Sequence, residues 1–329
     1  MLRALRKVVV RPRTALSVGR QLLSGIPRCV AQAGIAAIPQ YLRAFIGNNL
    51  GLESRLSMQE AGGTRTVSLA DGSTLQTAAA DGGIGQELAL VGTHEPDSSA
   101  HYRALLGRVA EAVDEPWVLE IGANVGYFAL MAAQAAPTAQ LVAVEPAPQN
   151  LALLRANIEA AGLTDRISVH QAAVSDTVGQ ASLQLSQRSN HHGLEASDRP
   201  VTATVEVPTL PFDAAVDRWL PVAPHVVRMD VEGHEWAVLE TMDAVLTGTE
   251  PLVLYIEVHP KLLGPERLAA VVERLAASSC QLEAIRAEAY MGRTVRSLST
   301  LEQLCATHPT DGFGYEVIMT RGLDGRASA

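Results

Sequence analysis

The sequence predicts an α/β protein in which a mostly parallel sheet carries helices on both faces. From residue 117 onwards, short apolar runs of strand length alternate with amphipathic stretches of helix length. The apolar runs are continuous rather than alternating, as expected for strands buried on both faces. The chain has 329 residues, of which 47% are hydrophobic and 19% charged, so it can form one large domain with appended segments.

The main domain is expected to span residues 115–329. Its strands are expected at 117–121, 141–144, 167–173, 226–230, 252–258, 280–287 and 314–320. Its helices are expected at 126–136, 147–161, 234–246 and 265–277. The last two strands are expected to be antiparallel to each other. In such a sheet, ligands bind outside the carboxyl ends of the parallel strands.

Residues 53–114 are expected to form a lead-in to this domain. Glycine-containing turn signals bracket two β-rich stretches at 65–69 and 74–78, which predicts a hairpin. A helix is expected to follow at 98–112, where apolar residues recur at helical spacing.

Residues 1–52 form a basic leader. They carry eight Lys or Arg residues and no Asp or Glu, although the whole chain has a formal net charge of −9. Three interpretations remain open: an extension that packs on the body, an interfacial segment attracted to anionic lipid, and an organelle transit peptide. The leader could therefore make a peripheral contact with a membrane.

Composition excludes several other classes of protein. The acidic balance argues against a nucleic-acid-binding protein, and no apolar run is long enough to span a bilayer. The three cysteines are widely spaced, which argues against a disulfide framework or a zinc ribbon and favours a reducing compartment. We expect a cytoplasmic protein, with a membrane-peripheral or an organelle-targeted protein as alternatives.

A glycine turn follows the first strand of the main domain. Gly122, Asn124 and Gly126 form the pattern G-x-N-x-G, not the G-x-G-x-x-G of dinucleotide-binding proteins. Gly122 permits a sharp turn and the close approach of a ligand, and Gly126 permits close packing of the helix on a strand. A pyrophosphate requires a row of free N–H groups at a helix N-terminus. This turn instead suits a ligand that needs both donors and acceptors.

An acidic residue, Glu145, ends the second strand, 23 residues after Gly122. A carboxylate at this point can accept hydrogen bonds from both hydroxyls of a ribose, each contributing about 1.5–3 kcal/mol. A ribose-binding acid without a phosphate cradle indicates an adenosine cofactor that carries no phosphate. S-adenosylmethionine fits that description.

These motifs, taken in order, resemble the FkbM family of S-adenosylmethionine-dependent methyltransferases over roughly residues 80–260. The matching segments are Glu120–Phe128, Val144–Asn157, Ala172–Asp176, Arg228–Glu235 and Glu257–His259. The resemblance implies a class I methyltransferase (Rossmann-like) fold with its core at about 118–260. It also implies O-methylation of a hydroxyl on a sugar, a glycan or a secondary metabolite.

The resemblance assigns cofactor contacts by position. The glycine turn would line the methionine end of the cofactor, Glu145 would hold the ribose, and residues 172–176 would lie near the adenine. Glu120 stands where the family commonly has Asp, so its contact can differ. The cofactor-binding residues assigned in this way are Glu120, Gly122, Asn124, Gly126, Glu145, Ala173 and Asp176.

Ionisable side chains gather near the ends of two later strands. Methyl transfer to an alcohol requires in-line geometry and a proton acceptor. Asp230 and Glu232 would share a face if their strand continues, as would Glu257 and His259 on the next strand. His259 is the first choice of general base because imidazole titrates near the working pH. Asp230 would orient it or accept the proton directly, and His234 is the second choice.

Two further features of this region remain open. No bound metal is expected, although Asp230, Glu232 and His259 are the kinds of donor that hold Mg²⁺. The polar stretch 190–193 lies between the third and fourth strands, where it could cover the acceptor, supply a base or form a plain turn.

Two other functions compete with a methyltransferase that acts on a small molecule or glycan. The first is an NAD-type oxidoreductase, against which the G-x-N-x-G turn argues. The second is a non-catalytic adenosine-binding scaffold, against which the intact Asp230, Glu232 and His259 argue.

Overall fold

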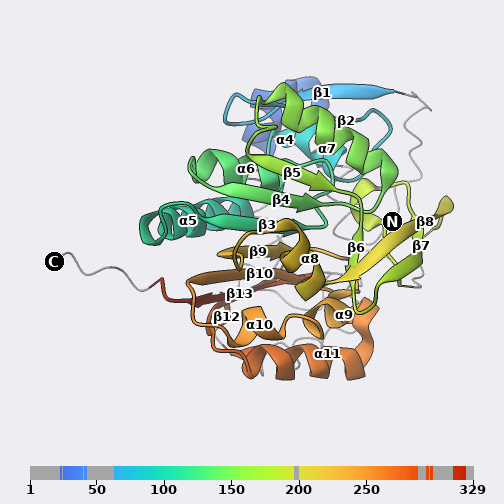
Figure 1. Ribbon diagram of the computed structural model, residues 1–329. Coiled ribbons are helices and arrows are strands. Elements are labelled where there is room, and N and C mark those ends of the chain that lie inside the picture. Colours follow the sequence, from blue (N-terminus) through green and yellow to red (C-terminus); the bar gives the residue numbers. More distant parts are fainter. Residues whose placement is uncertain are drawn as a thin grey trace.

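A computed structural model describes residues 23, 25–39, 41–42, 63–195, 200–287, 294–295, 297–298 and 314–323. In this part of the chain an eight-stranded sheet runs in the order β12-β11-β13-β10-β9-β3-β4-β5 (Figure 1). The strands are β3 Trp117–Ile121, β4 Gln140–Val144, β5 Ile167–His170, β9 Val226–Met229, β10 Leu252–Val258, β11 Gln281–Ala287, β12 Thr294–Val295 and β13 Tyr315–Arg321. Neighbours from β5 to β10 are parallel, whereas β13 is antiparallel to β10 and β11. The predicted class I methyltransferase fold is confirmed.

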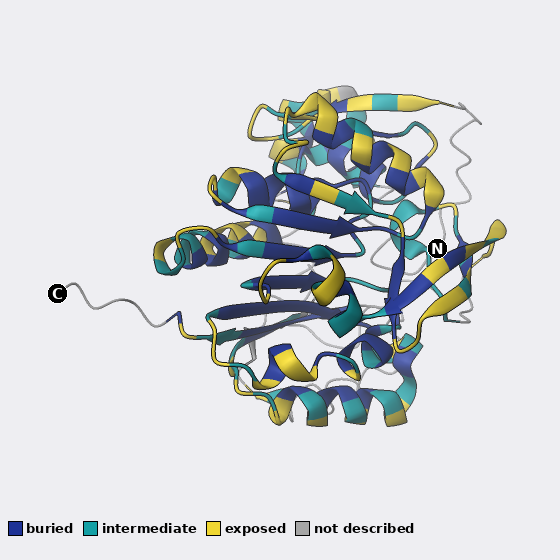
Figure 2. Ribbon diagram, viewed as in Figure 1, coloured by how far each residue is buried: buried dark blue, intermediate teal, exposed yellow. Residues whose placement is uncertain are grey.

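Helices cover both faces of this sheet, as the continuous apolar runs predicted. On one face lie α4 Ile84–Val91, α5 Pro96–Ala112, α6 Tyr127–Ala135 and α7 Pro148–Ala160. On the other lie α8 Phe212–Trp219, α9 Glu235–Leu239, α10 Asp243–Thr247 and α11 Pro260–Ala276. Side chains alternate between the two cores along each strand: Leu141 of β4 packs with the first set, and Val142 with the second. Figure 2 shows the resulting pattern, a buried sheet between helices exposed on their outer sides.

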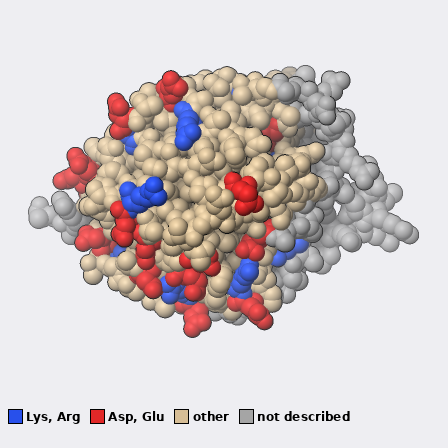
Figure 3. Space-filling model, turned by 45° about the vertical axis from the view of Figure 1, so that its right-hand side comes forward, with Lys and Arg blue, Asp and Glu red and all other residues tan. Residues whose placement is uncertain are grey.

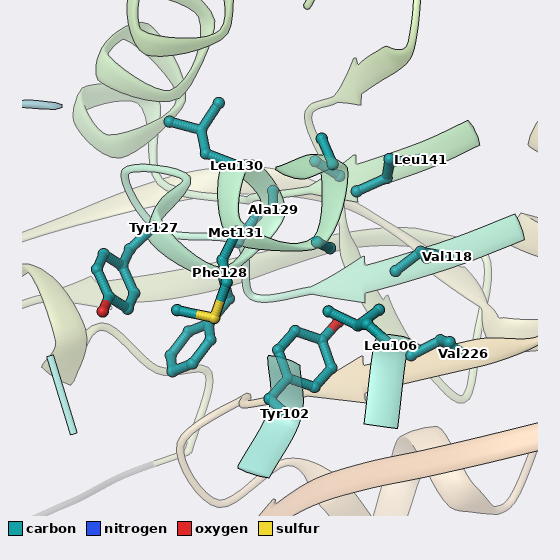
Figure 4. Close-up of a cluster of buried hydrophobic side chains, with 14 of the residues drawn as sticks. Tyr102, Leu106, Val118, Tyr127, Phe128, Ala129, Leu130, Met131, Leu141 and Val226 are labelled. Atoms are coloured by element: carbon teal, nitrogen blue, oxygen red, sulfur yellow. The ribbon is translucent and has the colours of Figure 1, made fainter. Parts of the chain in front are cut away.

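The first core is built around aromatic rings. Tyr102 of α5 meets Phe128 of α6 edge-on with ring centroids 5.8 Å apart, and it meets Tyr255 of β10 at 5.2 Å. Figure 4 shows Tyr102 and Phe128 beside Val118 and Val226, which project from neighbouring strands. This packing fixes the start of α6, and therefore also the glycine turn that precedes it.

The lead-in packs on the same core. The predicted hairpin is present as β1 Thr64–Ser68 and β2 Thr74–Ala78, and the predicted helix is α5. Helix α4, between them, was not predicted. Val67 and Leu75 of the hairpin belong to the same buried cluster as helices α4 to α7. The lead-in thus covers part of the sheet.

Two predicted elements were wrong in their extent. The strand expected at 167–173 ends at His170, and β6 Ala173–Ser175 joins a separate sheet with β7 Gly179–Leu185 and β8 Ala203–Pro211. Strands β7 and β8 were missed because they carry many polar residues and are mostly exposed over the first half of their length. The helix expected at 234–246 is broken into α9 and α10. At the break, the Thr241 hydroxyl donates a hydrogen bond to the carbonyl of Val238 and accepts one from the N–H of Phe212.

No helix in the described part of the chain combines the length and the apolar character that crossing a bilayer requires.

Candidate active site

A pocket opens at the carboxyl ends of β3, β9 and β10, where the parallel sheet was expected to bind its ligand. Its empty space, including the open mouth, is ≈ 580 Å³. The residues that follow the three strands all contribute to its lining: Gly122 to Asn124 after β3, Asp230 and Glu232 after β9, and His259 after β10.

The backbone is strained at this pocket. Among the described residues, the non-glycine positions with positive φ are Glu95 at 42°, Asn124 at 51° and Glu232 at 52°. All three line the pocket. Left-handed backbone is unfavourable for residues with a side chain and often marks functional sites. It therefore supports the pocket as the functional centre.

Unsatisfied polar atoms also gather here. Buried atoms without a hydrogen-bond partner among the described residues include Asn124 Oδ1, Asn190 Oδ1, Arg228 Nε and Asp230 Oδ1. Each belongs to a residue that lines the pocket. Because buried polar groups are nearly always paired, these atoms indicate a ligand with both donors and acceptors.

Gly122 has φ 80°, and a Cβ at this position would lie 1.9 Å from the backbone oxygen of Asp230. Its freedom is thus needed for the close approach of two protein turns, and the approach of a ligand to Gly122 remains a prediction. Gly126 caps α6 with φ 94°, and its Cβ would lie 2.7 Å from Leu154 of α7. The close packing predicted at Gly126 is present, but against a helix.

Glu145 faces the glycine turn. Its Oε2 accepts a hydrogen bond from the N–H of Asn124 and its Oε1 one from the N–H of Ala147, both at 2.8 Å. Burial raises the pKa of Glu145 to about 7. The described residues that line the pocket do not include Glu145, so its contact with a ribose remains a prediction.

His259 lies at the centre of four carboxylates. Its Nδ1 is 2.7 Å from Oε1 of Glu235, which is fully buried. Its Nε2 is 3.4 Å from Glu257, 3.5 Å from Glu232 and 4.0 Å from Asp230. Burial alone would lower the pKa of His259, but the negative charges of Glu232 and Glu235 raise it well above its usual value. The ring therefore holds a proton at neutral pH.

Asp230 shares this cluster and faces the pocket. Burial raises the pKa of its carboxyl group well above its usual range, and the neighbouring charges of Glu257 and Glu232 add to the effect. The strand predicted to carry Asp230 and Glu232 ends at Met229. A turn brings both residues to His259 instead, with Glu232 in left-handed backbone.

The ligand atoms of Asp230, Glu232 and His259 all lie within 4.8 Å of one another. These three residues could therefore hold a divalent cation, as the sequence left open.

Glu120 acts beneath the pocket rather than in it. It is directly opposite Arg228 on the neighbouring strand, and its Oε1 accepts a hydrogen bond from Arg228 Nη1 at 2.9 Å, with both side chains buried. The Arg228 guanidinium lies over the Phe128 ring, 3.7 Å from its centroid, and lines the pocket. Arg228, and not Glu120, is among the residues that line the pocket, so the cofactor contact of Glu120 remains a prediction.

Three other candidates lie away from the pocket. His234 binds Ser175 Oγ through Nε2 at 2.9 Å and Glu195 through Nδ1 at 3.0 Å. Ala173 is buried in a small core beside Ala147, and Asp176 is exposed and accepts a hydrogen bond from Ser175. None of the three lines the pocket in the described residues.

The lead-in contributes residues that the sequence analysis missed. His94 and Glu95 line the pocket, and His94 Nδ1 lies 2.6 Å from Glu87 Oε2. Burial would lower the pKa of His94, but the charges of Glu87 and Glu95 and the hydrogen bond to Glu87 together outweigh it and raise the pKa to about 10. No spacing in the sequence signals these residues, because only the packing of α4 and α5 on the sheet brings them to the strand ends.

Comparisons with known proteins agree with this geometry. Residues 120–275 match the family model of the methyltransferase FkbM domain. A search of curated proteins found no match.

Similar solved structures include TYW2 of P. horikoshii in complex with MeSAdo, at 13% identity and TM-score 0.40, covering 78% of this chain and 70% of that one. Precorrin-6y C5,15-methyltransferase of Geobacter metallireducens GS-15 is similar at 15% identity and TM-score 0.38, covering 67% and 87%. TYW2 of M. jannaschii in complex with AdoMet has 10% identity and TM-score 0.36, covering 80% and 87%. The assignment of the fold rests on the strand order, not on these likenesses.

Proposed function

We propose that this chain, whose residues 120–275 match the family model of the methyltransferase FkbM domain, is an S-adenosylmethionine-dependent methyltransferase that methylates a hydroxyl oxygen on a sugar, a glycan or a secondary metabolite. One observation carries this proposal. The glycine turn and the cluster around His259 line the same pocket, at the carboxyl ends of three parallel strands.

The lining fits the methionine end of the cofactor. That end carries an ammonium group, which donates hydrogen bonds, and a carboxylate, which accepts them. Asn124 Oδ1 is a buried acceptor and Arg228 Nε a buried donor, each without a partner among the described residues. When bound, S-adenosylmethionine supplies a methyl group made electrophilic by its sulfonium.

Asp230 is the proton acceptor in this proposal. Its Oδ1 is buried and has no hydrogen-bond partner among the described residues, and Asp230 lines the pocket. A general base works best when its pKa lies near the working pH, and burial moves the carboxyl group of Asp230 in that direction. Of the two roles expected for Asp230, orienting His259 or accepting the proton, this geometry favours the second.

His259 then supplies positive charge rather than a free base. Glu235 fixes its Nδ1, so Nε2 faces the carboxylates of Asp230 and Glu232. A protonated ring at this point favours the charged form of Asp230, which must be ionised before it can take a proton from the acceptor hydroxyl.

The test is Asp230→Asn. We expect methyl transfer from isotope-labelled S-adenosylmethionine to components of a cell extract to fall about 100-fold or more, because general-base catalysis is lost. Cofactor affinity, measured by calorimetry, should stay within about threefold, a difference of less than 1 kcal/mol. Mass spectrometry of the labelled extract also identifies the acceptor and the methylated atom.

Asp114→Asn is the matched control, since Asp114 is exposed and outside the pocket. Its rate should equal that of the wild type. If Asp230→Asn transferred methyl at the wild-type rate, Asp230 would not be the proton acceptor. If the wild-type chain did not bind S-adenosylmethionine, the whole proposal would fail.

A further inference from the structure

A strap crosses one side of the pocket. We use this name for residues 186–195, which follow β7 and contain the 3-10 helix η2 Ser189–His191. Asn190 and His191 of the strap line the pocket together with the glycine turn and Asp230. The strap belongs to the insert between β5 and β9, so a segment far from the strand ends along the chain completes the wall.

Asp81 clamps the first half of the strap to the lead-in. Its side chain is almost fully buried, at 4% exposure. Oδ1 accepts hydrogen bonds from the N–H of Gly83 at 2.9 Å and of Ser189 at 3.0 Å. Oδ2 accepts from the N–H of Gly85 and from Ser189 Oγ, both at 2.8 Å. Each carboxylate oxygen thus connects the start of α4 to the strap.

The remaining polar group of Ser189 is also held. Asn150 of α7 donates a hydrogen bond from Nδ2 to the carbonyl oxygen of Ser189 at 3.0 Å. The N–H, the hydroxyl and the carbonyl of Ser189 are therefore all fixed by the body of the protein.

A second clamp holds the other end of the strap. Glu195 is 3.0 Å from His234 Nδ1 and accepts a hydrogen bond from Arg267 Nη1 at 2.8 Å. His234 is itself bound to Ser175 Oγ. These contacts fit a positioning role for His234, and the catalytic role expected for it remains a prediction.

Between the clamps, Asn190 presents an unsatisfied acceptor. Its Oδ1 is buried and has no hydrogen-bond partner among the described residues. The side chain packs against Gly83, where an added Cβ would lie 2.1 Å from Oδ1. Leaving a buried acceptor unpaired is unfavourable, so a donor from a bound molecule is the natural partner.

We infer that the strap recognises the methyl acceptor. The amide oxygen of Asn190 accepts a hydrogen bond from a second hydroxyl or amino group of that molecule, next to the hydroxyl that Asp230 deprotonates. Asp81 is the positioning residue that holds Asn190 in place. This inference rests on the proposed function. It specifies the acceptor as a molecule with two neighbouring hydrogen-bond donors, such as a diol or an amino alcohol.

The test compares three variants with the wild type in the full chain. Isotope-labelled S-adenosylmethionine is incubated with a dilution series of cell extract, and the half-saturating extract concentration serves as a relative KM for the acceptor. For Asn190→Ala and Asp81→Asn we expect this concentration to rise about tenfold, while label transfer at saturation and the calorimetric Kd for S-adenosylmethionine stay within about threefold.

Gly83→Ala supplies an independent perturbation, because its methyl group displaces the Asn190 amide without removing it. It should raise the same half-saturating concentration. Asp71→Asn is the matched control. Asp71 accepts hydrogen bonds from the N–H and the hydroxyl of Ser73, in a similar turn on the exposed hairpin loop. It should leave every reading at the wild-type value.

Hydrogen exchange provides a readout that needs no acceptor. In Asp81→Asn, the amides of the strap should exchange at least about tenfold faster than in the wild type, whereas amides of β10 should not change.

Three results would overturn the inference. An unchanged half-saturating concentration in Asn190→Ala would remove Asn190 from the acceptor site. A loss of S-adenosylmethionine affinity in that variant would assign the strap to the cofactor. Strap amides that exchange at the wild-type rate in Asp81→Asn would show that Asp81 does not hold the strap in place. An extract in which the wild-type chain labels nothing refutes the methyltransferase function and, with it, the acceptor role of Asn190. In that case, hydrogen exchange alone tests whether Asp81 holds the strap in place.

Discussion

At the scale of single residues, Glu145, which faces the glycine turn, and Asp230, which lines the pocket, differ in what holds them. The Glu145 carboxylate accepts two backbone hydrogen bonds from the glycine turn and is otherwise buried. Asp230 accepts none at its buried Oδ1. Glu145 is therefore suited to a fixed contact with a ligand, and Asp230 to a group that gains and loses a proton.

The pKa of Glu145 gives a prediction about ligand binding. Below about pH 7 the carboxyl group holds a proton, and above it the ionised form can accept the hydrogen bonds of two ribose hydroxyls. Ribose binding should therefore tighten as the pH rises through about 7. Titration calorimetry with 5′-methylthioadenosine measures this directly, because that ligand has the ribose but lacks the titratable amino acid end.

Glu145→Ala should weaken the binding of this ligand about tenfold or more and remove the pH dependence. Glu159→Gln, at an exposed position of α7, should change neither. An unchanged dissociation constant in Glu145→Ala would remove the residue from the cofactor site.

Metal removal tests the charge balance around His259. The proton on its ring already places a positive charge among the carboxylates of Asp230, Glu232 and Glu257. We therefore expect EDTA to leave the rate of methyl transfer within about twofold of the untreated rate. A rate that collapsed in EDTA and returned with Mg²⁺ would show that a cation sits at this cluster instead.

The residues of the site could be predicted only where they follow strands. Gly122, Asn124, Asp230, Glu232 and His259 were found because the carboxyl ends of parallel strands meet at one edge. His94 and Glu95 come from a helical lead-in, and only the tertiary packing of that lead-in carries them to the pocket. The hydrogen bond between Glu120 and Arg228 was not predicted, because sequence position does not reveal a cross-strand partner.

At the scale of elements, the central strands β3, β4, β9 and β10 were predicted well because each is a mostly apolar run buried on both faces. All seven residues of β10 are buried, for example. Strands β7 and β8 carry polar residues along much of their length, so the sequence did not distinguish them from a loop. Strand β8 pairs with both β6 and β7, and a local pattern cannot show such pairing.

The turn after β3 gives a prediction about stability. Gly122→Ala would combine a left-handed backbone with a Cβ only 1.9 Å from the backbone oxygen of Asp230. We expect the free energy of unfolding to fall by about 3 kcal/mol or more. Urea unfolding followed by circular dichroism measures this change.

Gly107→Ala is the matched control within α5. An added Cβ there meets nothing within 4 Å, so the better helix former should raise the free energy of unfolding by about 0.5–1 kcal/mol. A small effect at Gly122, comparable to that at Gly107, would contradict the close contact between the turns after β3 and β9.

At the scale of the whole molecule, charge is distributed unevenly. The face in Figure 3 shows Lys and Arg interspersed with Asp and Glu. The basic leader contrasts with this mixture, but of residues 1–52 only 23, 25–39 and 41–42 are described. In that part Cys29 and Tyr41 are buried. A peripheral contact of the leader with anionic lipid remains a prediction, since most of the leader lies outside the described residues.

The lead-in and the main domain share one core, and this has a consequence for truncation. Val67, Leu75 and Leu88 pack in the same cluster as helices α6 and α7. Asn157 of α7 also accepts a hydrogen bond from the N–H of Gln76 at 2.6 Å and donates one to its carbonyl at 3.0 Å. A chain that begins at residue 115 would expose this face of the sheet, and with it a large apolar area.

We therefore expect the chain truncated before residue 115 to lose cooperative unfolding in urea, whereas the full chain should unfold in a single transition. Tryptophan fluorescence can follow both, because Trp117, Trp219 and Trp236 all remain after truncation.

A chain that lacks only residues 1–22 is the control and should unfold as the full chain does. If the chain from residue 115 unfolded cooperatively and still bound S-adenosylmethionine, the lead-in would be an accessory segment. Loss of both would instead show that the lead-in, which supplies His94 and Glu95 to the pocket wall, is as much a part of the methyltransferase unit as the sheet itself.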